Sequence, residues 1–197
     1  MSATDATLGL SVGGGIAVAA IAFLLLIVIC VAAIYNRLVR LRVQVRNAWA
    51  QIDVQLKRRH DLIPNLVETV KGYAGHERET LERVIAARNR AVAATSPAQS
   101  IAAENMLTGA LRQLFALSEA YPDLKANVNF QQLAEQLTST ENKISFAREG
   151  YNESVRGYNE AIQVFPAVML AGMFGFKSEE FFELDSPADK EVPQVKF

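Results

Sequence analysis

The chain has little of what builds covalent, metal or nucleotide chemistry. Its 197 residues include one cysteine and two histidines. A lone cysteine cannot form an intrachain disulfide and cannot supply a cysteine-based zinc site. His76 and Glu77 begin like a zinc-protease motif, but Thr80 stands where the second histidine is needed. We therefore predict no catalytic, cofactor-binding or metal-binding residues, and no enzymatic activity.

Phosphate loops, nucleophile elbows and alternating apolar strands are also missing from the sequence. The net charge of −1 gives no reason to expect nucleic acid as a partner, and no feature points to a small-molecule substrate. Apolar residues recur instead at spacings of three and four, which is typical of amphipathic helices. The sequence therefore predicts an all-α protein.

One apolar run dominates the N-terminal part of the chain. Residues 16–35 read IAVAAIAFLLLIVICVAAIY, and no charged residue lies between Asp5 and Arg37. Twenty helical residues span about 30 Å, the thickness of the hydrocarbon core of a bilayer. We predict a transmembrane helix at 16–35 after a short extracytoplasmic tail at 1–15. A cleaved signal peptide is the alternative, although the segment before the run lacks the usual positive charge.

Cations follow this run and do not precede it. Positive charge stays on the cytoplasmic side of a span, so the N-terminus is expected outside and the following domain in the cytoplasm. The same side chains could contact anionic headgroups, with membrane lipid as the partner. The four predicted membrane-surface residues are Arg37, Arg40, Arg42 and Arg46.

A second feature of the N-terminal part is a small-xxx-small pattern. Gly9, Gly13 and Ala17 follow one another at intervals of four. Small residues at this spacing let two spanning helices approach closely. These three residues are therefore candidates for helix pairing in the membrane.

The helical pattern does not stop where the apolar run ends. Apolar residues recur every three or four positions from Leu38 to Tyr73, and no stop signal occurs before Arg59. We expect one helix that leaves the membrane without a break. Pro64 lacks an amide hydrogen, so we expect it to kink this helix or to begin a new one.

The remaining chain predicts an antiparallel bundle of about four long helices with coiled-coil character, within a cytoplasmic domain at 36–185. Residues 186–197 are expected to form a disordered acidic tail. Ser96 and Asn129 are the predicted caps of two of the helices. The helices expected after the first are 76–95, 97–120, 129–165 and a short one at 167–174.

Two polar features exceed what a simple bundle needs. Residues 57–61 read KRRHD, and consecutive positions point around a helix, so at least one cation must face the bundle. We expect it to pair with Glu141 or Glu149. A repeated Tyr-Asn pair, at 151–152 and 158–159, is predicted to form a polar seam, within the bundle rather than between subunits.

Three long blocks of sequence resemble a known family. They are AWAQIDVQLKRRHDLIPNLVETVKGYAGHE (48–77), PDLKANVNFQQLAEQLTSTENKISFAREGYNESVRGYNEAIQVFP (122–166) and FGFKSEEFFE (174–183). Together they are similar to the signatures of the LemA family of bacterial membrane proteins. The resemblance implies a membrane helix at the bacterial inner membrane, a helical cytoplasmic domain and no established catalytic residues.

These observations predict a membrane-anchored helical scaffold that assembles with copies of itself. Two alternatives stay open at this point. One is a regulatory or adaptor subunit of a membrane-bound enzyme such as a protease, with another membrane protein as its partner. The other is a sensor of anionic membrane surfaces.

Overall fold

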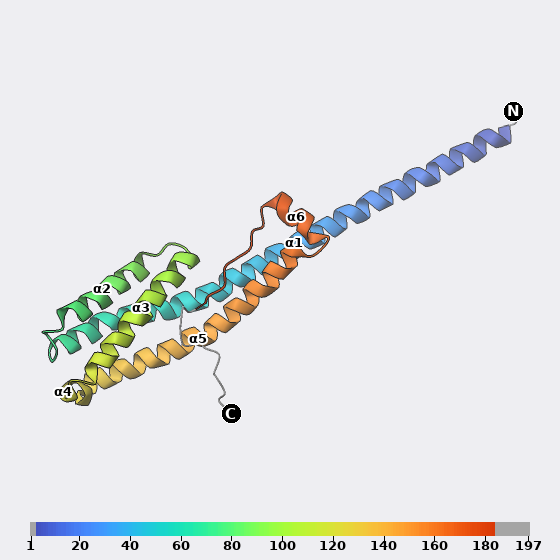
Figure 1. Ribbon diagram of the computed structural model, residues 1–197. Helices are drawn as coiled ribbons and strands as arrows, with labels where there is room; N and C mark the ends of the chain where they lie inside the picture. The colour runs from blue at the N-terminus through green and yellow to red at the C-terminus, as the bar shows by residue number, and fades with distance from the viewer. Residues whose placement is uncertain (1–2, 184–197) are drawn as a thin grey trace, which may run out of the picture. The chain divides into compact units, whose positions relative to one another are not determined.

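The protein is all-helical in the part of the chain that its computed structural model describes, residues 3–183 (Figure 1). No strand occurs within this range, which confirms the predicted fold class. The helices are α1 (Ala3–Lys71), α2 (Arg78–Ala93), α3 (Pro97–Ser118), α4 (Pro122–Ala126), α5 (Val128–Gln163) and α6 (Ala167–Phe174).

The chain divides into two compact units, and α1 and α5 each contribute to both. One unit contains residues 45–156 together with the segment that begins at Glu179. The other contains the N-terminal part of the chain up to Gln44 and residues 157–178. We refer to them as the bundle unit and the apolar unit. As predicted, α1 runs without a break past Tyr35 and Arg59.

In the bundle unit, α1 and α5 run antiparallel. The ring of Trp49 lies 5.4 Å from that of Tyr151, and Arg59 is 3.1 Å from Glu141. Trp49 and Arg59 are ten residues apart on α1. Their partners on α5, Tyr151 and Glu141, are also ten residues apart, in the opposite chain direction. This is the register that two antiparallel helices of equal rise require. The helices α2 and α3 form a hairpin beside them (Figure 1), so the predicted antiparallel bundle is confirmed.

The buried stripe of α1 packs, from Ile63 onward, with residues of α2, α3 and α5 in one core. On α1 the buried stripe follows the predicted three-four spacing: Val45, Ile52, Leu56, Ile63, Leu66 and Val70. On α2 the sequence pattern predicts a face of Leu81, Val84, Ile85, Arg88 and Val92. This is partly wrong, because Ile85 and Val92 are exposed and Ala87 and Ala91 are buried instead. The small alanines let α2 approach the rest of the core closely, and the larger side chains turn outward.

Pro64 lies inside α1 and does not begin a new helix. A proline cannot donate to the carbonyl four residues earlier, here that of His60. The Nε of Arg88, on α2, donates to this carbonyl at 3.0 Å. A side chain from another helix therefore replaces the missing backbone donor, and the helix continues past the proline.

This replacement predicts that Pro64 and Arg88 are energetically coupled. Arg88→Ala should lower the free energy of unfolding by about 1–2 kcal/mol, because the carbonyl of His60 loses its donor. Pro64→Ala supplies a backbone N–H to the same carbonyl, so the double variant should lose at least about 0.5 kcal/mol less than the sum of the single variants. Urea unfolding of the full chain in detergent, followed by circular dichroism, measures these values.

Arg83→Ala is the matched control, because Arg83 is an exposed arginine on the same helix. Its cost should not depend on Pro64. Strict additivity between Arg88→Ala and Pro64→Ala would contradict the replacement of one donor by the other.

The helix caps agree with the sequence prediction at one of two places. Ser96 caps α3 as predicted, with its hydroxyl accepting from the backbone N–H of Gln99 at 3.3 Å. At α5 the prediction of Asn129 is wrong. The Oδ1 of Asn127 accepts from the N–H of Phe130 at 3.0 Å, and Asn129 lies inside the helix. Both asparagines are followed by helix-compatible residues, so the sequence alone did not separate them.

In the apolar unit, α6 has the predicted bounds and folds back onto α1. The ring of Tyr35 meets those of Phe174 and Phe176, with centroids 5.0 and 5.7 Å apart. Between these phenylalanines, Gly175 ends α6 with φ at 69°, a left-handed conformation that glycine adopts without strain. The turn places two successive aromatic rings on one tyrosine.

The N-terminal part of α1 is long and apolar enough to cross a membrane. Its large apolar side chains from Val18 to Ile29 are all exposed, so no other part of the described chain covers them. The side-chain surroundings of Gly9, Gly13 and Ala17 lie outside the described residues, as does the tail at 186–197. Helix pairing at the small residues stays a prediction.

Candidate functional site: a buried charge cluster and an open groove

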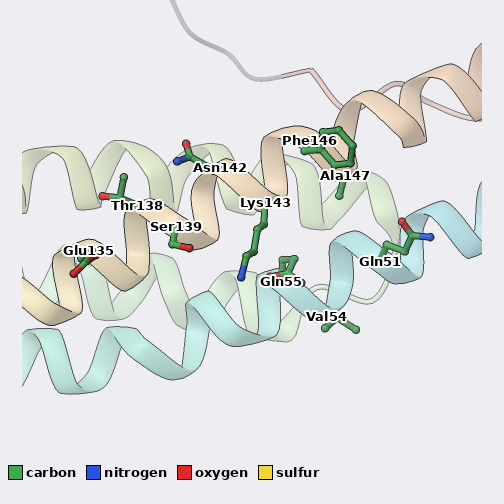
Figure 2. Close-up of a pocket in the computed structure, with 10 residues that line it drawn as sticks. All are labelled: Gln51, Val54, Gln55, Glu135, Thr138, Ser139, Asn142, Lys143, Phe146 and Ala147. Carbon is green, nitrogen blue, oxygen red and sulfur yellow. The ribbon is translucent and has the colours of Figure 1, made fainter.

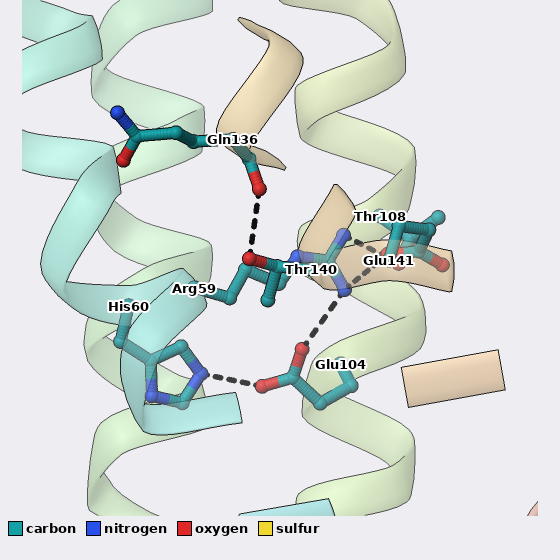
Figure 3. A network of polar contacts seen from close by, with 7 residues as sticks. All are labelled: Arg59, His60, Glu104, Thr108, Gln136, Thr140 and Glu141. Atoms are coloured by element: carbon teal, nitrogen blue, oxygen red, sulfur yellow. Dashed lines mark hydrogen bonds and ion pairs between the residues drawn. The ribbon is translucent and has the colours of Figure 1, made fainter. Parts of the chain in front are cut away.

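A cluster of charged side chains lies inside the bundle unit (Figure 3). Arg59 on α1 is only 5% exposed, and Glu104 on α3 is 2% exposed. The Nη1 of Arg59 lies 3.2 Å from Glu104 Oε2 and 3.1 Å from Glu141 Oε2 on α5. Its Nη2 donates to Thr108 Oγ1 at 3.0 Å. One guanidinium thus joins three helices.

His60 completes the cluster from the neighbouring position on α1. Its Nε2 lies 2.5 Å from Glu104 Oε1, so both oxygens of this carboxylate have partners. Thr140, which is 1% exposed, donates to the carbonyl of Gln136 on its own helix at 2.8 Å. Each of these buried polar groups therefore has a hydrogen-bond or ion-pair partner close by, as buried polar groups require.

The arrangement favours a structural role over a chemical one. A general base needs access to a substrate proton, and the carboxylate of Glu104 is buried and already engaged on both oxygens. Among residues 3–183, no group of three or more histidine, cysteine, aspartate or glutamate side chains is placed to hold a metal ion. The contacts of this cluster hold α1, α3 and α5 together. We call its members the latch: Arg59, His60, Glu104, Thr108 and Glu141.

The expected pairing of the KRRHD run is confirmed for Glu141. The buried cation is Arg59, and Glu149 is exposed and lies outside the latch. Glu104 was not identified from the sequence, although the spacing of residues on α3 contains the information needed to find it. Glu104 lies three residues before the buried Leu107, so it falls on the core stripe of α3, where a lone acid requires a buried cation.

The two acids of the latch should differ sharply in their contribution to stability. Glu104→Ala should lower the free energy of unfolding by about 3–5 kcal/mol, because Arg59 is left buried with too little negative charge around it. Glu141→Ala should cost less than about 1 kcal/mol, because water already reaches this carboxylate. Chemical denaturation of the full chain in detergent compares the two directly. Equal costs would contradict the latch.

The first Tyr-Asn pair of the predicted seam holds the segment that follows α6. Tyr151 donates its hydroxyl to the carbonyl of Glu180 at 2.9 Å. The amide of Asn152 makes two bonds to the backbone of Phe182, at 2.8 and 3.1 Å. Phe182 is 1% exposed, and its ring lies 6.1 Å from that of Trp49. The prediction that this pair acts within the bundle is confirmed.

The environment of Tyr151 keeps its hydroxyl protonated. Burial, followed by the negative charges of Glu179 and Glu180, raises the pKa of Tyr151 to about 12. A neutral phenol remains a hydrogen-bond donor at every physiological pH. The bond to the Glu180 carbonyl is therefore insensitive to pH in the cell.

An open groove of about 1050 Å³ lies between α1 and α5 in the bundle unit (Figure 2). Its apolar lining includes Val54 on α1 and Phe146 on α5, which are 64% and 79% exposed. Lys143 extends from α5 toward Gln55 on α1 (Figure 2). The remaining lining is polar: Gln51, Glu135, Thr138, Ser139 and Asn142, with Ala147 at one end.

The predicted membrane-surface arginines do not share one environment. Arg37, Arg40 and Arg46 are exposed. Arg42 is half-buried, and its guanidinium lies 4.8 Å from the ring centre of Phe176. At this distance the cation is attracted to the ring face. Arg42 therefore contacts the segment after α6, and the contact of the four arginines with lipid headgroups stays a prediction.

The fold and the site define a class of protein. An apolar helix of membrane-spanning length leads into a helical bundle whose interior charges are engaged with one another. This is a membrane-associated helical protein. The chain belongs to the LemA family, whose family model matches residues 48–197.

Curated relatives agree with this assignment. The chain is 29% identical to Protein LemA of Metamycoplasma hominis over 134 residues, which is 66% of this chain and 60% of that protein. It is 25% identical to Magnetosome protein MamQ of Magnetospirillum gryphiswaldense over 189 residues, or 82% of this chain and 70% of that protein. The alignment with the first of these relatives thus spans less than two thirds of its length, and neither name denotes an enzyme.

Proposed function

We propose that this chain is a single-pass membrane anchor that presents a helical scaffold, assembles with copies of itself and performs no catalysis. The exposed arginines that follow the apolar segment support an N-terminus outside and a domain in the cytoplasm, at the inner membrane of a bacterial cell. The observation that carries the scaffold proposal is the groove between α1 and α5. It presents large apolar side chains to solvent in a unit that already has a complete core.

The lining of the groove fits a helix from a second copy. Val54 and Phe146 supply exposed apolar surface, and Glu135 and Lys143 supply charges of both signs, so a self-complementary contact can match each sign. Such self-complementarity is what a twofold interface requires. The size and symmetry of the assembly are left open by this argument.

The groove predicts which substitutions dissolve the assembly. Val54→Asp and Phe146→Asp should each shift the full chain in nanodiscs or mild detergent from a multimer to a monomer, because a carboxylate is placed in the apolar contact. Mass photometry or native mass spectrometry gives the particle mass. Val128→Asp is the matched control, since Val128 is 62% exposed on the same helix, α5, and outside the groove.

A monomeric wild-type chain at every concentration would contradict self-assembly. If the groove variants kept the multimer but lost a co-purifying membrane protein, the chain would instead be an adaptor or regulatory subunit. That second candidate uses the same groove with a different occupant.

The exposed Arg37, Arg40 and Arg46 favour an additional contact with anionic lipid. Each such charge contributes about 1 kcal/mol near an anionic surface. A triple change of these three residues to Gln should reduce the anionic lipid that co-purifies with the chain from mixed vesicles, as measured by lipid mass spectrometry. Folding should be unaffected, because all three side chains are exposed.

The matched control changes three exposed arginines of α2 and α3 to Gln, namely Arg83, Arg90 and Arg112. It alters the net charge equally and should leave the lipid ratio as in the wild type. The same loss in both triple variants would assign the effect to overall charge and contradict a surface contact by the first set.

A further inference from the structure

We propose that α6 is a second membrane-contacting element, whose outward face enters the interfacial layer of the bilayer beside the end of the span. This inference rests on the proposed anchoring of α1 and goes beyond it. The juxtaposition that carries it is the contact between the last residue of the apolar run, Tyr35, and the last residue of α6, Phe174, whose rings lie 5.0 Å apart.

The depth of α6 follows from this contact. If residues 16–35 cross the hydrocarbon core, Tyr35 lies at its boundary, where tyrosine is enriched in membrane proteins. Phe174 touches Tyr35, and Phe176 touches both Tyr35 and the guanidinium of Arg42 two turns further along α1. The C-terminal end of α6 therefore lies at the boundary between lipid tails and headgroups.

Both faces of α6 are apolar, and only one of them is used by the protein. The alanines at 167 and 171 are buried. Met169 and Met173 each lie two residues after one of these alanines. They are 63% and 77% exposed, so they lie on the opposite face of the helix. Phe165, just before the helix, is 79% exposed. A helix that is apolar all round needs an apolar environment on its outer side as well.

The charge pattern around α6 fits an interfacial position. No charged residue occurs from Gln163 to Phe176, and charge resumes with Lys177. The exposed Arg37 and Arg40 follow the span on α1. The uncharged segment is suited to acyl chains, and Lys177 together with the exposed Arg37 and Arg40 is suited to anionic headgroups.

The bilayer is favoured over a second protein as the occupant of this face. The face is continuous with the apolar end of α1 through Tyr35, and the large side chains of that end are exposed from Val18 to Ile29. Lipid already surrounds any span, so it reaches α6 without a further binding partner.

Depth-dependent quenching of an environment-sensitive fluorophore tests this proposal on the full chain in vesicles of phosphatidylcholine and phosphatidylglycerol. The native Cys30, which is exposed on α1, is labelled as the anchor reference. In a Cys30→Ala background, Met173→Cys and Phe165→Cys report on α6. Val128→Cys is the matched control, because Val128 is 62% exposed in the bundle unit and lies outside the groove.

We expect the label at Cys30 to be quenched by nitroxide lipids that carry the group deep in the acyl chain. Labels at Met173→Cys and Phe165→Cys should be quenched by shallow nitroxide lipids and shifted to shorter emission wavelength. The label at Val128→Cys should show neither effect. Circular dichroism of each variant verifies that the helices are retained.

Two results would overturn the inference and leave the anchor intact. One is quenching at Cys30 without quenching at either α6 position. The other is an emission shift at α6 that no lipid quencher alters and that disappears on dilution of the protein in lipid, which would assign the face to a second copy. A label at Cys30 that no lipid quenches would instead overturn the anchoring proposal itself, together with everything that rests on it.

Discussion

The structure depends on a constraint placed on one helix: α1 must be compatible with two solvents. Its N-terminal part exposes apolar side chains in every direction, whereas its C-terminal part buries them along one stripe. The transition occurs within a continuous backbone, without a turn at which the two parts could be separated. The helices α2, α3 and α5 supply the partners of the groups that α1 leaves unmatched.

Specific side chains on neighbouring helices pair with the buried charge and the unpaired carbonyl of α1. Arg59 would be an isolated buried charge without Glu104 and Glu141, and the carbonyl of His60 would lack a donor without Arg88. Each of these partners lies far along the chain. A helix with such interior irregularities is stable only in the assembled bundle, which ties the geometry of α1 to the correct packing of α2, α3 and α5.

Much of this architecture was predictable because helical periodicity is a strong signal. The bounds of α6, the cap at Ser96 and the pairing of one cation of the KRRHD run with Glu141 or Glu149 followed from spacing and capping rules, and the structure identifies the pair as Arg59 and Glu141. What could not be predicted depends on contacts between distant segments. The role of Arg88 at the proline and the orientation of α2 are set by neighbours that no local pattern encodes.

In the candidate site, too, some features could be predicted from local sequence and others depend on contacts between distant segments. The arginines after the span were recognisable as exposed cations, but the ring under Arg42 comes from residue 176 and could not be assigned from local sequence. Glu104 could have been found, because an acid on a core stripe is visible in the sequence. The groove required the structure, since its two walls come from α1 and α5.

The segment that contains Phe182 has a consequence for biosynthesis. Trp49 and Tyr151 are covered by Phe182 and by the backbone of Glu180, which the ribosome adds after both of them. This aromatic cluster therefore closes only after all of α1 and α5 has been synthesised. A product that stops before residue 180 would leave the aromatic surface uncovered, and would be a ready substrate for cellular proteolysis.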